Sequence, residues 1–170
     1  DNAVASCVVF SKSGPRKNNY RLFNIPKSLA GNDIGSLEHV IGRRLKYYDD
    51  PKIKPDLVLI DGGESQLKFV KKVIDGSKHK DLEVISIVKG VNRLRATETI
   101  IGKAGILELE KYSKAFLLLQ EIRDESHRFA LQAQRKKKRS KITKSELDNI
   151  KGIGNILKQR LLKKFKSIAN

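Results

Sequence analysis

The 170-residue sequence predicts an α/β fold, with a mixed β-sheet and flanking helices followed by a small all-α segment. Two strand-like segments, 4–10 and 20–25, come first with only a turn-rich stretch between them. A wholly apolar run at 57–60 then stops abruptly at a polar turn, as a strand buried on both faces does. Antiparallel strands followed by parallel ones imply a mixed sheet with helices packed on it.

The first elements are a hairpin and a helix. The segment VASCVVF at 4–10 and the segment at 20–25 flank a stretch rich in Ser, Gly and Pro, which predicts an antiparallel pair with a long loop. Asn32 or Asp33 can cap the helix that follows. Its apolar residues recur at helical spacing, namely Ile34, Leu37, Ile41, Leu45 and Tyr48.

The middle of the chain has the pattern of a βαβ unit. The run LVLI at 57–60 predicts a buried strand, and Val84 to Val88 predicts another. Between them, a helix is indicated by apolar residues that share one face, namely Leu67, Val70 and Ile74. Strands joined through a helix in this way lie parallel in one sheet.

A second hairpin and a long helical region come next. Segments 97–101 and 106–109 are joined through two glycines and predict the hairpin. From Lys111 onward the spacing is helical, and no Gly or Pro occurs before Gly152. The apolar residues that give this spacing are Ala115, Leu118, Ile122 and Phe129.

The chain is strongly basic, and the charge is concentrated in its last third. Thirty-six Lys and Arg against 19 Asp and Glu give a net charge of +17. Residues 1–110 hold 19 basic and 14 acidic side chains, a net of +5, and residues 111–170 hold 17 and 5, a net of +12. The run 135–144 has seven cations and no carboxylate. It is either a solvated linker or helix end, or, as the net charge favours, a nucleic-acid contact. An anionic membrane surface is the weaker alternative, because the run lacks an apolar face.

Composition excludes several classes of protein. A hydrophobic content of 39% supports a packed core, and no apolar run approaches the roughly 18 residues of a membrane span. The single cysteine, Cys7, allows no disulfide framework and, with three scattered histidines, no Cys/His zinc cluster. A cytoplasmic location is therefore expected. The chain contains no Met, so we expect it to be a fragment or a processed product.

Two aspartates are candidate site residues. Asp61 ends the predicted strand at 57–60, and open α/β sheets place functional groups beyond the carboxyl ends of their strands. A turn or N-cap role before the next helix explains Asp61 equally well. Asp33 precedes the apolar face of the first helix, and a structural N-cap explains it fully.

The segment RDESHR at 123–128 interrupts an otherwise apolar helix with polar residues. Arg123 and His127 are four residues apart and Asp124 and His127 are three apart, so these side chains can share a face. A lone helical His is more often a surface or core residue. Here carboxylates and an imidazole in a phosphate-attracting chain form a plausible site for Mg²⁺ or Mn²⁺. Two such ions can activate water for phosphodiester cleavage.

The last thirty residues contain LDNIKGIG at 147–154, followed by apolar residues at helical spacing. Gly152 and Gly154 would let backbone N–H groups approach a phosphate, and Lys151 and Lys158 add positive charge. The pattern predicts a helix-hairpin-helix that binds a DNA backbone. An ordinary helical hairpin with a glycine turn is the alternative.

The segments VASCVVF, LVLIDGG, RDESHRFA with the basic run RKKKR, and LDNIKGIG occur in an order that resembles the C-terminal half of the UvrC family. These are bacterial nucleotide excision repair endonucleases, and the resemblance covers essentially the whole chain. It implies a ribonuclease H-like (RNase H-like) endonuclease domain at 1–134, a basic linker at 135–144 and part of a helix-hairpin-helix segment at 145–170. It also implies incision 5′ to a lesion in double-stranded DNA that UvrB has marked.

The family's active site is an Asp, Asp, His constellation that uses a divalent metal, Mg²⁺ or Mn²⁺. The Asp of LIDGG corresponds to Asp61, the His of RDESH to His127, and the acidic residue before the first helix to Asp33. Arg123 would either orient the scissile phosphate or pair with an acidic neighbour. Further DNA contacts are expected from Arg135, Lys136, Lys137, Lys138, Arg139, Lys151, Gly152, Gly154 and Lys158.

The sequence departs from the family pattern in three ways. The family's F-D-x-S-H motif, whose Asp is a principal metal ligand, does not occur in these residues. Only one of two tandem helix-hairpin-helix motifs is seen, and the N-terminal nuclease and the UvrB-binding segment are absent. We therefore expect this piece to be catalytically impaired. The alternative from another class is a non-catalytic nucleic-acid-binding module, with steep salt dependence and no metal requirement.

Overall fold

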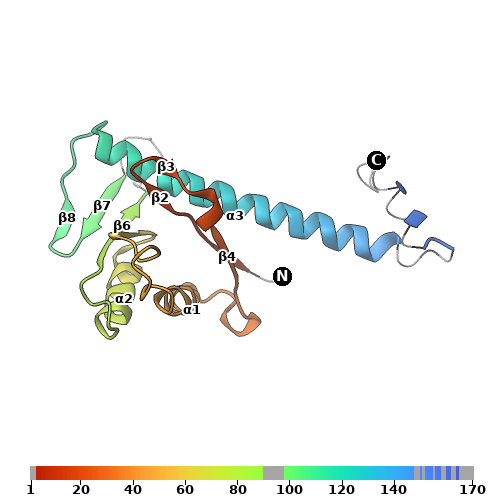
Figure 1. The fold of residues 1–170 in the computed structure, drawn as a ribbon, viewed down its shortest axis with the longest axis horizontal. Helices are drawn as coiled ribbons and strands as arrows, with labels where there is room; N and C mark the ends of the chain where they lie inside the picture. The colour runs from red at the N-terminus through yellow and green to blue at the C-terminus, as the bar shows by residue number, and fades with distance from the viewer. Residues whose placement is uncertain are drawn as a thin grey trace.

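The computed structural model describes residues 3–89 and 98–147, the latter for side chains only as far as 137, and residues 150, 152–154, 156–157, 160–161 and 164. The chain has a mixed α/β fold in which helices cover both sides of the β-strands (Figure 1). The predicted fold class is confirmed for this part of the chain.

The N-terminal strands form an antiparallel pair. β1 (Val4–Cys7) pairs with β4 (Arg21–Asn24), and Val4 lies opposite Asn24 in the register. The predicted strand at 4–10 is shorter than expected. Val9 lies beyond β1, and its carbonyl accepts a hydrogen bond from the Arg16 N–H at 2.7 Å.

The connection between β1 and β4 folds into a second, smaller hairpin. β2 (Phe10–Ser11) pairs with β3 (Gly14–Pro15), and a 3₁₀ turn (Lys17–Asn19) leads into β4. Gly14 has a φ of +96°, a conformation that glycine adopts without strain. This hairpin lies in front of α3 in the view of Figure 1.

The helix α1 (Asp33–Leu45) begins at a side-chain cap. A 3₁₀ turn (Lys27–Leu29) precedes it, and Asn32 is the N-cap residue. The Asn32 Oδ1 accepts a hydrogen bond from the Gly35 N–H at 2.9 Å. Of the two residues expected to cap this helix, Asn32 therefore does so, and Asp33 is the first helical residue.

The central sheet has four strands in the order β5-β6-β7-β8. β5 (Leu57–Asp61), α2 (Glu64–Asp75) and β6 (Glu83–Val88) form the predicted βαβ unit with parallel strands. β7 (Thr99–Gly102) and β8 (Gly105–Leu107) form the predicted second hairpin, which adds to β6 in antiparallel orientation.

The last element, α3 (Lys114–Leu147), is a single helix of 34 residues. The Ser113 Oγ accepts a hydrogen bond from the Phe116 N–H at 3.2 Å and so caps its start. The basic run at 135–144, for which a linker and a helix end were the structural alternatives, continues this helix. In Figure 1 the helix extends well beyond the body formed by the other elements. Within the described residues, no helix is long and apolar enough to cross a membrane.

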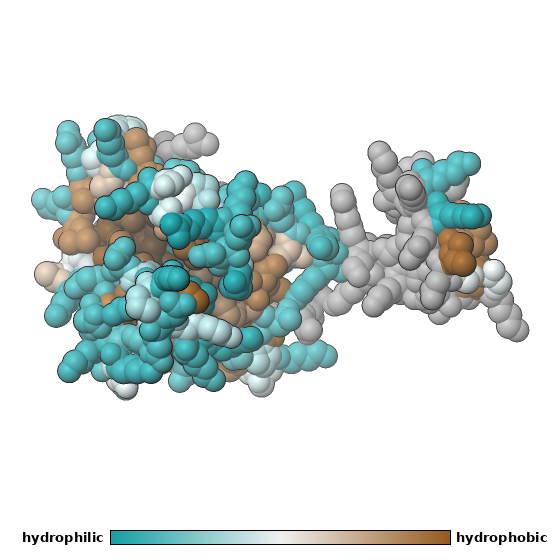
Figure 2. Space-filling model, viewed as in Figure 1, coloured by the Kyte–Doolittle hydropathy of each residue, from teal (hydrophilic) through white to brown (hydrophobic). Residues whose placement is uncertain are grey.

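Two apolar cores lie on opposite faces of the central sheet. On one face α1 and α2 bury Ile41, Leu67, Val70 and Ile74 against Ile60 and Val84 of the sheet. On the other face α3 buries Phe116 and Leu119 against Ile87 and Ile100. The body is covered largely by hydrophilic residues on the face that Figure 2 shows, with apolar residues visible between them.

The strands form separate sheets rather than one. β1 and β4 pack on α1 through a third cluster that includes Phe23 and Val40, and β1 also contacts α3. The β1–β4 pair thus lies between the same helices as the central sheet. Among the described strands, β1 pairs only with β4 and β5 only with β6, so β1 and β5 each keep a free edge.

Candidate active site

Asp61 is the last residue of β5 and lies on the side of the sheet that faces α3. Successive side chains of a strand point to opposite faces. Val58 and Ile60 pack with the core beneath α1 and α2, whereas Leu59 packs with Phe116 and Leu119 of α3. Asp61 has the same parity as Leu59, and its side chain is exposed. The strand therefore presents an accessible carboxylate at its carboxyl end.

The capping role that competes with a functional role for Asp61 is filled by another residue. Gly63 is the N-cap of α2, and the Gln66 Oε1 accepts a hydrogen bond from the Gly63 N–H at 2.7 Å. A Cβ on Gly62 would lie 2.0 Å from the Gln66 Oε1, so Gly62 leaves room for this contact. Among the described residues, the Asp61 carboxylate has no hydrogen bond and no ion pair.

His127 lies on α3 immediately after a contact between this helix and β1. The Ser6 Oγ donates a hydrogen bond to the Ser126 carbonyl at 3.0 Å and lies 2.9 Å from the Ser126 Oγ. The His127 side chain is exposed and makes no hydrogen bond or ion pair within the described part of the chain. Its imidazole is therefore accessible to solvent.

Arg123, one turn before His127, is held in a buried ion pair. Its Nη1 donates to the Glu98 Oε1, and its Nε and Nη2 donate to the Asp124 Oδ1 at 3.0 and 2.6 Å. The Arg123 side chain is only 10% exposed and that of Glu98 8%. Of the two roles expected for Arg123, the structure shows the pairing with acidic neighbours.

Asp33 begins α1, where its side chain is exposed. No three His, Cys, Asp or Glu side chains of the described residues lie close enough together to hold a metal ion. Asp61 supplies a carboxylate oxygen, the donor type that suits Mg²⁺ or Mn²⁺, and His127 supplies an imidazole nitrogen, a softer donor. The metal site, and the place of Asp33 in it, stay predictions.

The expected DNA-binding residues fall in two places. Arg135 and Lys136 are exposed on α3, and the Lys137 Nζ donates to the Asn24 Oδ1 at 2.5 Å. Lys138 and Arg139 belong to the same helix, but their side chains lie outside the described part. The basic run thus continues the helix that carries His127.

The predicted helix-hairpin-helix lies mostly outside the described residues. Gly152 has a φ of +96°, and the Ile153 N–H donates to the Ile150 carbonyl at 3.2 Å, so the chain turns at Gly152. Gly154 is exposed, and Lys151 and Lys158 fall outside the described residues. The motif and the domain boundaries stay predictions.

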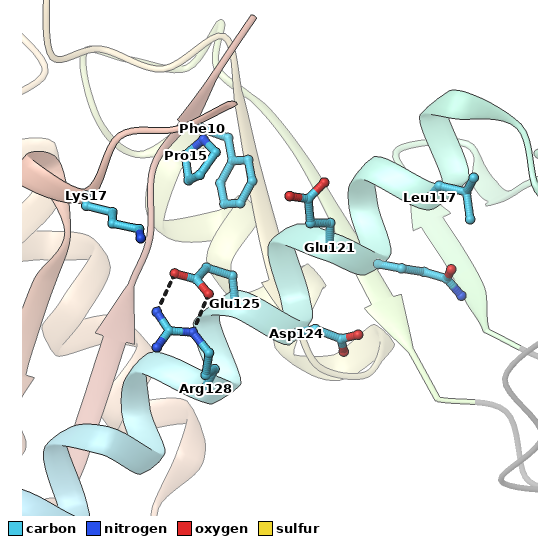
Figure 3. Close-up of a pocket in the computed structure, with 9 residues that line it drawn as sticks. Phe10, Pro15, Lys17, Leu117, Glu121, Asp124, Glu125 and Arg128 are labelled. Atoms are coloured by element: carbon cyan, nitrogen blue, oxygen red, sulfur yellow. Dashed lines mark hydrogen bonds and ion pairs between the residues drawn. The ribbon is translucent and has the colours of Figure 1, made fainter. Parts of the chain in front are cut away.

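An open pocket of about 750 Å³ lies between the β2–β3 hairpin and α3 (Figure 3). Figure 3 shows Glu121 pointing toward Phe10, whereas Glu125 points toward Arg128, with which it is paired. The Arg128 guanidinium holds the pKa of the Glu125 carboxyl below its ordinary value. Three carboxylates line this pocket, those of Glu121, Asp124 and Glu125. Two cations, Lys17 and Arg128, also line it and offset most of this negative charge, so the lining is not the cationic surface that a phosphate backbone needs.

Three residues that organise the site were not predicted from the sequence, namely Ser6, Gln66 and Glu98. Glu98 directly precedes β7, and a lone carboxylate before a buried strand is the signal that could have indicated it. Ser6 points to the helical side of a short strand, and its partner is 120 residues away. No local pattern in the sequence indicates that contact.

Comparison with known proteins finds a family and many relatives. Residues 1–131 match the UvrC RNase H endonuclease domain. The chain is 40% identical over 164 residues to UvrABC system protein C of Legionella pneumophila (strain Paris), which covers 95% of this chain and 26% of that protein. It is 38% identical over 169 residues to UvrABC system protein C of Bacteroides thetaiotaomicron, which covers 98% of this chain and 28% of that protein. The chain thus spans about a quarter of the length of these curated relatives.

Proposed function

The chain belongs to the UvrC family, with the RNase H endonuclease domain at residues 1–131, and we propose that it supplies the active site for the incision 5′ to a lesion during nucleotide excision repair. The observation that carries this proposal is the exposure of the Asp61 carboxylate and its position in the sheet. Asp61 is an accessible carboxylate, unpaired among the residues that the structure describes, at the carboxyl end of a central strand and on the side of the sheet that faces the helix bearing His127.

We propose that Asp61 and His127 hold a divalent cation, Mg²⁺ or Mn²⁺. When bound, such an ion activates water and stabilises the charge that develops on a phosphodiester. The carboxylate oxygen of Asp61, and the lack of other partners for both side chains within the described residues, support this. His127 is a ligand or a proton-transfer partner in this proposal, and Asp33 is the less secure third group.

We propose that a strand bearing the family's F-D-x-S-H motif pairs between β1 and β5 in the full-length protein. Both strands have a free edge among the described strands, and both lie between α1 and α3. A strand inserted there would end beside Asp61 if it ran parallel to β5. Its aspartate would then add a donor to those of Asp61 and His127.

The substrate in this proposal is damaged double-stranded DNA. The net charge of +17 and the exposed cations of α3 support a phosphate backbone as the ligand. The relatives are named as parts of the UvrABC system, and we propose that this chain acts in such a system, after UvrB has marked the lesion. The predicted helix-hairpin-helix would hold the duplex farther from the cut.

Single substitutions in the full-length protein test the proposal. Asp61→Asn and His127→Ala are each expected to lower 5′ incision of a duplex carrying one bulky adduct by at least about 10²-fold, because each removes a proposed ligand. DNA binding, measured by fluorescence anisotropy, is expected to stay within about twofold. The matched control is Asp81→Asn, which removes an exposed ion pair with Lys54. Normal incision by either site variant would overturn the assignment.

A non-catalytic nucleic-acid-binding module remains the second candidate. One observation favours it, since the described residues gather no three metal-binding side chains. The two candidates differ in their need for metal. Incision that stops on chelation and returns with Mn²⁺ supports the nuclease, whereas metal-independent, salt-sensitive binding without any cleavage supports the binding module.

A further inference from the structure

We propose that Glu98 is a positioning residue for the candidate active site, because it holds Arg123 and thereby the turn of α3 that carries His127. The inference rests on the proposed function for its effect on incision. Its geometric part concerns only how α3 is held, and that part has a test of its own.

Both oxygens of the Glu98 carboxylate accept hydrogen bonds from side chains of α3. The Oε1 accepts a hydrogen bond from the Arg123 Nη1, and the Oε2 accepts one from the Gln120 Nε2 at 2.8 Å. Gln120 and Arg123 are three residues apart, so one carboxylate from the sheet holds two neighbouring positions of the helix. Because Glu98 directly precedes β7, this contact ties α3 to the central sheet.

Because the Glu98–Arg123 ion pair is buried, it favours one orientation of α3 about its axis. The Glu98 and Arg123 side chains are 8% and 10% exposed, so separation of the pair would leave a buried charge without its partner. The guanidinium is planar and donates in fixed directions, and its other two nitrogens, Nε and Nη2, each donate to the Asp124 Oδ1. A rotation of α3 about its axis would therefore break several charge-assisted hydrogen bonds at once.

A second contact holds the same stretch of helix from the other sheet. The Ser6 Oγ of β1 bonds to Ser126, three residues after Arg123. The helix between Gln120 and Ser126 is thus held by Glu98 at Gln120 and Arg123 and by Ser6 at Ser126. His127 follows immediately, so the direction of its imidazole depends on both contacts.

Pure stabilisation is the competing explanation for Glu98. A buried ion pair is weak evidence for stability, since its desolvation offsets much of its attraction. A structural role predicts loss of activity in proportion to the unfolded fraction. A positioning role predicts a lower kcat in protein that is fully folded, because misplacement of a catalytic group by about 1 Å costs on the order of 10²-fold.

The test compares Glu98→Gln, Glu98→Asp and the control Asp81→Asn in the full-length protein. Glu98→Gln keeps the shape but loses the charge and one acceptor, and we expect kcat for 5′ incision to fall about 10²-fold with KM for DNA within about twofold. Glu98→Asp keeps the charge and is expected to recover part of the rate. The control is expected to incise like the wild type.

The second readout does not depend on activity. Selective isotope labelling of histidine gives separate imidazole signals, and the signal that His127→Ala removes is that of His127. We expect this signal to shift in Glu98→Gln and to stay in place in Asp81→Asn. If Glu98→Gln does not fold, the same readouts on Glu98→Asp decide.

Each outcome has one meaning. An unchanged kcat, an unmoved His127 signal, or a loss of rate that equals the unfolded fraction overturns the positioning role. If Asp61→Asn and His127→Ala incise normally, the proposed function fails, and a shifted His127 signal in Glu98→Gln still supports the geometric part. The two failures are thus distinguishable.

Discussion

Asp61 and Arg123 have opposite surroundings, and the difference decides what each side chain is able to do. Asp61 is exposed and unpaired within the described residues, because Gln66 bonds the Gly63 N–H that an aspartate at this turn would otherwise cap. Arg123 is buried and bonded to two carboxylates. The carboxylate is therefore free to bind a cation, whereas the guanidinium would have to leave its partners to reach a phosphate.

Tyr20 provides a test of burial at the residue scale. Burial, followed by the nearby Glu125 carboxylate, raises the pKa of the Tyr20 phenol to about 12. The neutral phenol is thus favoured in the folded protein, so this contribution to stability is complete below the unfolded pKa of about 10 and is lost as the pH rises to about 12.

We expect Tyr20→Phe to remove the loss of stability that ionisation of the Tyr20 phenol causes at high pH. The variant should gain stability relative to the wild type as the pH rises from about 9 to 12, because its unfolded state has no phenol to ionise at this position. Urea unfolding at a series of pH values measures the difference in the free energy of unfolding. Tyr112→Phe, at an exposed site, is the control. A constant difference between Tyr20→Phe and the wild type across this range would contradict the prediction.

The sequence indicated Asp61 and His127 because each belongs to a short local motif. Asp61 ends an apolar strand, and His127 follows two acids on a helix. Glu98 could not be found in this way. Its pairing with Arg123 joins residues 25 apart in the sequence and depends on where α3 crosses the sheet, which no local spacing encodes. For the same reason the sequence could not decide between the two roles of Arg123.

At the scale of elements, the cap of α1 can be tested directly. Asn32→Ala removes the acceptor for the Gly35 N–H and is expected to lower the free energy of unfolding by about 1 kcal/mol. Asn32→Asp retains an acceptor at the helix N-terminus and is expected to leave stability within about 0.5 kcal/mol of the wild type. Urea unfolding of both variants distinguishes these results. Equal stability of the two variants would show that the side-chain cap contributes little.

The elements themselves were largely predictable, since strands and helices follow the apolar spacing from residue 4 to residue 129. The extent of α3 was not. Like charges repel, so the run at 135–144 is not expected to fold by itself, and the sequence left a linker and a helix end as alternatives; Lys and Arg are good helix formers, and an established helix continues through them. The bond from Lys137 to Asn24 also holds the beginning of this run against β4. Apolar spacing could not show that continuation, because the run has almost no apolar residues.

At the scale of the whole molecule, the uneven charge predicts how DNA binding responds to salt. Arg135 and Lys136 are exposed on α3, and each phosphate contact releases counterions when it forms. We expect the double substitution Arg135→Gln and Lys136→Gln to make the slope of log binding constant against log salt concentration shallower by about 2.

The matched control replaces Lys72 and Lys80, two exposed lysines of the α2 region, with Gln. It changes the net charge by the same amount and is expected to leave the slope within about 0.5 of the wild-type value. The slope is measured by fluorescence anisotropy with an undamaged duplex over several salt concentrations. Equal slopes for the two double variants would mean that α3 makes no particular contact with DNA.

At this scale the predicted mixed sheet is confirmed in β5–β8, which combine parallel and antiparallel pairs, but the N-terminal strands do not join it. The order of strands was foreseen, but β1 and β4 stand apart from the central sheet. The apolar pattern of a strand indicates which of its faces is buried, but it does not indicate which strand pairs with it. Pairing depends on contacts between residues far apart in the sequence. The helices α1 and α3 nonetheless hold both sheets in the same body.

Because α3 is one unbroken helix, it also sets a distance. Between His127 and the helix end at Leu147 the backbone rises about 30 Å, at about 1.5 Å per residue. That is the length of about nine base pairs of duplex DNA, at about 3.4 Å each. If the proposed function holds, a DNA contact beyond Leu147 would lie nearly one helical turn of the duplex from the candidate active site, and α3 would act as a spacer between the two.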